Sequence, residues 1–257
     1  MTPTEVEKAL DDLIDSHSAE IQNEIEKIES LALAQVDTIT VNSNGDIVAP
    51  SRSMPEAKAA SKIIVRDVDL RFESVTNQVI QDFALIEAIV ATVYNTEIND
   101  TNLRSLIAIS KTTFNDYKSI SKDTANRLNK AIIDFSVAGM SRDDLKTEIK
   151  GILTGSSDVK GVPMSVRANQ FTQDSIMRYH NAANLAVAEQ VGVKKFKYYG
   201  NIMATTRPFC VSHVGEIKTK EAWENIGRNQ SWKGKASSNI FIDVGGYNCR
   251  HHLTPVF

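Results

Sequence analysis

The chain has 257 residues, of which 42% are hydrophobic and 24% are charged, and its formal net charge is −3. These values are typical of a globular protein with a sizeable core. The longest apolar run, around residues 84–94, is interrupted by Glu87, so no segment reaches the roughly 18 apolar residues of a membrane-spanning helix. The N-terminal MTPTEVEKALDD does not predict a secretory signal, and we expect the protein in a cytoplasm. Two cysteines are too few for a disulfide-rich scaffold.

The charge is distributed unevenly along the chain. Residues 1–30 hold nine acidic and two basic side chains, whereas residues 194–257 hold ten basic and four acidic ones. This asymmetry indicates either that the two ends meet different partners or that both are ordinary solvated surfaces.

The N-terminal third predicts a helix and a hairpin. The spacing of Thr4 and Glu7 is that of a capping box, and a helix is expected over residues 4–34. Its apolar residues recur every three or four positions and form one stripe: Val6, Leu10, Leu13, Ile14, Ile21, Ile25, Ile28 and Leu31. Asn44-Gly45 lies between two short apolar pairs, which predicts a tight β-hairpin.

Further helices are expected downstream. A stripe with near-heptad spacing predicts a helix over residues 55–94, about 60 Å long if it is continuous. The alternative is a shorter, kinked helix inside a bundle. Shorter helices are predicted over residues 103–118, 122–138 and 142–153, the last with Ser141 as its N-cap.

The small, polar segment 154–163 predicts a domain boundary. After it we expect a helix over residues 165–191, a strand in the KKFKYYG segment and another strand in FIDVGG. The predicted fold is therefore α+β but predominantly α. It has an elongated helical region with a small β-hairpin (residues 1–160) and a small α+β C-terminal domain (residues 161–257).

Both cysteines and three of the five histidines lie in two short C-terminal motifs. Cys210-x2-His213 predicts a hairpin-like knuckle, and Cys249-x-His251-His252 offers further ligands. Thiolates and imidazoles are the donors that zinc prefers, so the motifs predict a structural zinc site. Two alternatives remain: buried thiols beside hydrogen-bonded histidines, and a Cys210–Cys249 disulfide.

Basic residues beside these motifs are candidate phosphate contacts. Arg207 and Arg250 adjoin the cysteine motifs, and Lys233 and Lys235 lie between them. Together they predict a nucleic-acid-binding face, while the alternative is that the arginines pair with acidic side chains of the same domain.

Residues 165–257 resemble the Mu F-like minor head proteins of tailed bacteriophages. The resemblance is carried by the order of five elements: YHNAANLAVAEQVGV, KFKYYG, TRPFC with His213 following, Trp232-x-Gly234, and GGYNCRHHLTPV. Met203 stands where many members have an acidic residue, and His251-His252 where many have another cysteine.

The resemblance implies a virion component inside the capsid near the portal vertex, present in the host cytoplasm during assembly. It implies head assembly or DNA handling at ejection, with the portal protein, the major capsid protein and phage DNA as partners. We expect residues 1–160 to carry the portal or capsid contacts. No catalytic residue and no membrane contact are predicted. The alternative functions are a zinc-supported nuclease and a DNA-binding module.

Overall fold

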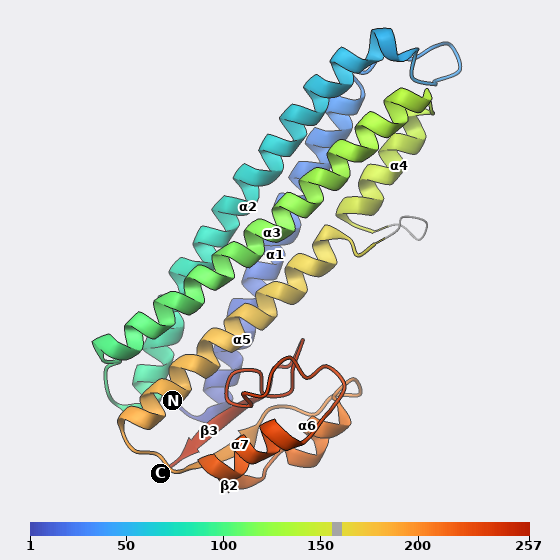
Figure 1. The fold of residues 1–257 in the computed structure, drawn as a ribbon. Helices are drawn as coiled ribbons and strands as arrows, with labels where there is room; N and C mark the ends of the chain where they lie inside the picture. Colours follow the sequence, from blue (N-terminus) through green and yellow to red (C-terminus); the bar gives the residue numbers. More distant parts are fainter. Residues whose placement is uncertain (156–160) are drawn as a thin grey trace. The chain divides into compact units, whose positions relative to one another are not determined.

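The structure is a computed structural model that describes residues 1–155 and 161–257. Its described residues form seven helices and one small antiparallel sheet near the C-terminus (Figure 1), which confirms the predicted fold class of predominantly helical α+β. They group into two compact units. We call residues 17–78 and 114–169 the helical unit, and residues 1–16, 79–113 and 170–257 the terminal unit.

The helical unit takes its residues from five helices. They are α1 (Pro3–Val36), α2 (Pro50–Tyr94), α3 (Asp100–Ala138), α4 (Arg142–Leu153) and the first turns of α5 (Met164–Gln190). Its core consists of side chains that recur at helical spacing, among them Ile21, Ile25, Ile28, Ile64, Val68, Phe72, Leu128, Ile132, Leu145 and Ile149. The apolar stripes of the sequence are therefore buried within the protein.

Helix α2 runs without interruption over 45 residues, so the alternative of a shorter helix is wrong. It begins five residues before the predicted start and contains Pro55. The two helices predicted over residues 103–138 are one, since the intervening residues 119–121 include neither glycine nor proline to end it. Helix α4 has its predicted bounds, and Ser141 Oγ accepts the backbone N–H groups of Asp143 and Asp144 as an N-cap does.

The predicted hairpin is present but minimal. Val41 and Ile47 form an isolated antiparallel bridge, and Gly45 adopts a positive φ of 85° in the turn between them. Its return arm bonds to the segment before α4, where Asp46 bridges Ser141 and Ile47 N–H donates to Met140 O at 3.0 Å.

In the terminal unit, a three-stranded antiparallel sheet has the order β2-β1-β3. The strands are β1 (Lys195–Tyr199), β2 (Ile217–Thr219) and β3 (His252–Val256); α6 (Pro208–His213) and α7 (Lys220–Asn229) lie between them in the chain. Phe196 and Tyr198 alternate with exposed or half-buried lysines in β1 and are fully buried. Trp223 of α7 is buried too, and its indole N–H donates to Phe196 O at 2.9 Å.

Two local predictions in this unit are wrong. FIDVGG is not a strand, because Asn239 folds it into a turn: its side chain accepts the N–H of Phe241, and its carbonyl accepts the N–H groups of Ile242 and Asp243. The expected knuckle at residues 210–213 is instead part of helix α6, which Pro208 opens in its first turn.

The expected boundary at residues 154–163 lies partly outside the described residues, and the division at residue 160 stays a prediction. The compact units follow a different grouping, in which the terminal unit includes residues 1–16 and 79–113.

None of the described helices has both the length and the apolar character to cross a bilayer.

Candidate metal centre

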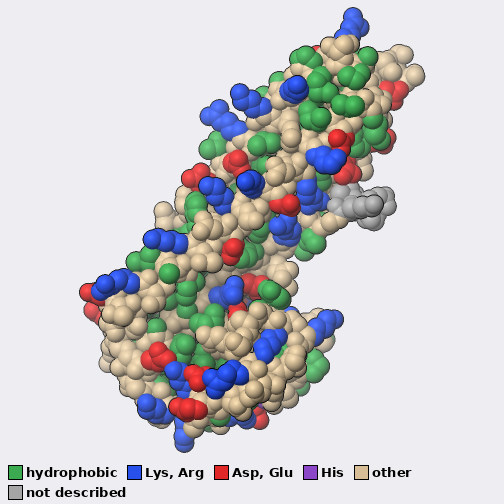
Figure 2. Space-filling model, viewed as in Figure 1, with side chains coloured by type: hydrophobic (Ala, Val, Ile, Leu, Met, Phe, Trp, Pro, Cys, Tyr) green, Lys and Arg blue, Asp and Glu red, His purple; other side chains and the backbone are tan. Residues whose placement is uncertain are grey.

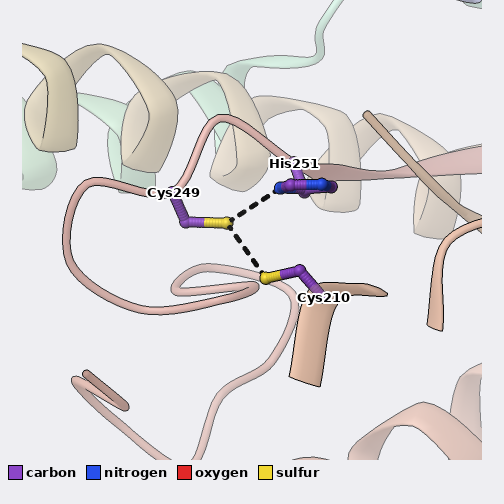
Figure 3. A group of neighbouring side chains, drawn as sticks. All are labelled: Cys210, Cys249 and His251. Atoms are coloured by element: carbon purple, nitrogen blue, oxygen red, sulfur yellow. Dashed lines mark hydrogen bonds between the residues drawn. The ribbon is translucent and has the colours of Figure 1, made fainter. Parts of the chain in front are cut away.

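Three of the predicted ligands meet in the terminal unit. Cys210 lies on α6, and Cys249 and His251 lie in the segment just before β3. All three side chains are buried and point toward one another (Figure 3). Their donor atoms lie within 4.8 Å of one another, so the cluster could hold a metal ion.

The two sulfur atoms are 4.0 Å apart, and Cys249 Sγ lies 3.5 Å from His251 Nδ1. Both cysteines are free. The sulfur separation is nearly twice the roughly 2.05 Å of a disulfide bond, so the structure does not contain the disulfide alternative.

Two glycines let the cluster close up. A Cβ on Gly245 would lie 2.5 Å from Cys210 Sγ and 2.4 Å from Cys249 Sγ. A Cβ on Gly200, whose φ is +147°, would lie 2.5 Å from His251 Cδ2. The sequence analysis assigned neither Gly200 nor Gly245 to the site, because nothing in the sequence shows which side chain approaches a glycine.

The cluster favours one thiolate. Cys210 Sγ accepts a hydrogen bond from the Tyr198 hydroxyl at 3.3 Å and lies 4.0 Å from Cys249 Sγ, a contact in which either thiol could donate. These bonds, with the Cys249 contact first, lower the pKa of Cys210, whereas burial opposes the shift. The pKa of Cys249 is raised because its proton is shared with Cys210 and because it is buried. A buried site that already stabilises a thiolate suits a cation.

The other two predicted ligands lie elsewhere. His213 Nδ1 is 2.5 Å from Glu216 Oε2. The ring of His252 packs edge-on against His180, with 5.4 Å between the centroids. Burial lowers the pKa of His252 to about 3 and that of His180 to about 4, which keeps both neutral. Neither His213 nor His252 joins the described cluster.

The predicted phosphate contacts are mostly engaged inside the protein. Arg207 donates to the carbonyls of Gly245 and Tyr247. Arg250 pairs with Asp11 at 2.9 Å and lies 3.5 Å from Asp15.

The two lysines differ in their surroundings. Lys235 donates to Gln230 O at 2.7 Å and lies over the Trp232 ring, whereas Lys233 is exposed. On the face drawn in Figure 2, basic and acidic side chains are interspersed.

A pocket of about 410 Å³ adjoins the cluster. Cys210, Cys249 and His251 form part of its wall, and the remainder is largely polar, with Glu7, Asp11, Gln173, Asn201, Thr205, Thr206, Arg207, Asn248 and Arg250 among its lining residues. The three side chains can thus bind a metal ion in the wall of this pocket.

Comparisons with known protein families, with curated proteins and with solved structures found no match to this chain.

Proposed function

We propose that the chain is a minor head protein of a tailed bacteriophage, related to the Mu F-like kind and located inside the capsid near the portal vertex. The observation that supports the proposal is the convergence of the motifs that carry the resemblance. Three of the five motifs, which contain Arg207, Trp232 and Tyr247 and lie up to 40 residues apart in sequence, contact one another.

The contacts of Arg207, Trp232 and Gly234 carry this convergence. Arg207 of TRPFC reaches the carbonyls of the GGYNC segment, and the Trp232 indole N–H donates to Gly245 O at 3.2 Å. Trp232 also stacks on Phe209, with 3.9 Å between the ring centroids. Gly234 O accepts the N–H of Tyr247 at 3.0 Å. These motifs therefore belong to one packed site, as expected if they were inherited together as a unit.

The partners in this proposal are the portal protein, the major capsid protein and packaged DNA. Residues 1–160 are expected to carry the portal or capsid contacts, but most of their apolar stripe residues are buried within the chain. Docking must therefore use surfaces other than these buried stripes.

The test is co-expression of the full chain with the portal and major capsid proteins of the same phage, followed by mass spectrometry of purified heads. We expect the chain in heads in few copies, and its loss when the portal gene is omitted. Incorporation that does not depend on the portal would refute the portal contact. Absence from heads assembled with all three proteins would refute the assignment itself.

We propose further that the cluster of Cys210, Cys249 and His251 holds zinc. At zinc–sulfur and zinc–nitrogen distances of about 2.3 and 2.05 Å, tetrahedral geometry puts two sulfurs about 3.8 Å apart and a sulfur and a nitrogen about 3.6 Å apart. The Cys210–Cys249 and Cys249–His251 separations are 4.0 and 3.5 Å here, and all three donor atoms lie within 4.8 Å of one another.

Zinc content of the full chain purified without chelators tests this. We expect about one zinc per chain, its loss in Cys249→Ala and in Gly245→Ala, and its retention in the matched variant His213→Asn. Gly245→Ala keeps all three ligand residues, and its Cβ would crowd the two sulfurs. Wild-type protein without zinc, or zinc lost equally in His213→Asn, would contradict the proposed ligand set.

A further inference from the structure

The metal centre presents three protein ligands rather than four. Among the described residues, the close group of cysteine, histidine and carboxylate donors consists of Cys210, Cys249 and His251 alone. Structural zinc sites are closed by four protein ligands, whereas sites with three keep the fourth position for water or an added ligand. The count of donors places this cluster with the second kind.

The surroundings of the cluster decide which side is open. The backbone of Gly245 lies against both sulfurs so closely that no Cβ fits there. The hydroxyl of Tyr198 covers Cys210 from another side, where it donates to the sulfur. The pocket of about 410 Å³ reaches all three ligands and offers the free space for a fourth.

The charges that line this pocket are largely satisfied. Glu7 Oε1 accepts the N–H of Asn201 at 3.1 Å, and Asp11 pairs with Arg250. Arg207 is bonded to two carbonyls. A zinc ion with two thiolates is neutral, so an incoming anion meets neither a strong attraction nor a strong repulsion from the centre.

We propose that the fourth coordination position opens into this pocket and binds the thiolate of a small thiol. The inference rests on the proposed zinc site. A metal that already takes two sulfurs and one imidazole is matched by a soft donor, and the pocket has room for a molecule of a few heavy atoms. Binding replaces a metal-bound water and releases the thiol proton to solvent, so the apparent affinity should rise with pH.

Cobalt(II) substitution of the full chain tests the inference with 2-mercaptoethanol as the probe. Cobalt bound at the cluster should give a near-ultraviolet thiolate-to-cobalt charge-transfer band and visible ligand-field bands. Addition of the thiol should intensify the charge-transfer band and shift the visible bands, with saturation at lower thiol concentration as the pH rises.

Two variants localise the effect. Thr205 lines the pocket, whereas the neighbouring Ile202 is exposed and lies outside the lining. Thr205→Trp should keep the cobalt bands and lose the response to thiol, and Ile202→Trp should keep both.

The two proposals fail in different ways. Thiolate–cobalt bands that do not respond to the thiol in the wild-type chain would overturn the open position and leave the zinc site standing. No such bands at all would overturn both. A thiol response retained in Thr205→Trp would show that the added ligand does not enter through the pocket, which also overturns the inference.

Discussion

The carboxylate of Asp174 on α5 accepts the backbone N–H of Asn248 at 2.6 Å. Asn248 adopts a positive φ of 56° and directly precedes Cys249. The bond therefore fixes the turn that presents a cluster cysteine. Burial raises the pKa of Asp174 to about 6, although the Asn248 N–H and the charge of Arg178 act in the opposite direction.

The raised pKa makes stability depend on pH. Because the folded-state pKa is above the ordinary value of 3.8, the contribution of Asp174 to the free energy of unfolding is full below pH 3.8 and is lost as the pH rises through about 6. Asp174→Asn keeps a carbonyl oxygen for Asn248 and removes the buried charge. We expect it to raise the free energy of unfolding at pH 8 by up to about 3 kcal/mol, with little gain at pH 4. Urea unfolding at both pH values measures this. The exposed Asp12→Asn is the control, and equal effects of Asp174→Asn at the two pH values would contradict the assignment.

Gly246 and Gly215 form a matched pair for the packing of the GGYNC segment. Their φ angles are +87° and +90°, but a Cβ on Gly246 would lie 1.8 Å from Gly234 O, and a Cβ on Gly215 would meet nothing within 4 Å. Alanine at either position carries about 1–2 kcal/mol of backbone strain. We expect Gly246→Ala to lose several kcal/mol more than Gly215→Ala, as measured by denaturant midpoints. Similar losses would show that the Gly234–Gly246 approach is not tight in solution.

Arg207 should act on stability rather than on DNA. Its guanidinium bonds two carbonyls at once, a fork that a lysine ammonium cannot reproduce. Arg207→Lys should lower the free energy of unfolding by about 1–3 kcal/mol and leave salt-dependent retention on a duplex DNA column unchanged. Lys233 is exposed, so Lys233→Ala should leave the free energy of unfolding unchanged and should change retention on the DNA column only slightly. Weaker retention by Arg207→Lys at full stability would instead identify Arg207 as a phosphate ligand.

A fragment of residues 161–257 should not reach its native packing alone. In the terminal unit, Tyr94 OH donates to Asn184 Oδ1 at 2.9 Å, Glu7 accepts the N–H of Asn201, and Asp11 pairs with Arg250. We expect the fragment to lack near-ultraviolet circular dichroism and to regain it when residues 1–155 are added. A fully structured fragment would support the division at residue 160 and contradict the unit described here.

The elements that the sequence predicts well are those whose signals are local. Ser141 caps α4 as expected, and the stripe from Val6 to Ile28 is buried as its spacing indicates, except for the half-buried Leu13. FIDVGG fails because its apolar side chains are buried in a turn held by Asn239, and burial alone does not separate a turn from a strand.

The metal centre was predicted in part for a similar reason. Spacing along the chain identified five candidate ligands. Only the fold determines that His213 contacts Glu216 and that His252 packs against His180. Gly245 meets Cys210, which lies 35 residues away in the sequence, and Gly200 meets His251, which lies 51 residues away, and no local pattern reports such contacts.

The terminal unit is assembled from residues 1–16, 79–113 and 170–257, and this order has a consequence for biosynthesis. Asp11 leaves the ribosome early, whereas Arg250 is separated from it by 239 residues. At a translation rate of about 5–20 residues per second, that separation corresponds to roughly 10–50 s. The helical unit, complete at residue 169, can fold while the last segment is still being made. The first turns of the nascent chain must wait, so the terminal unit matures only after translation is nearly finished.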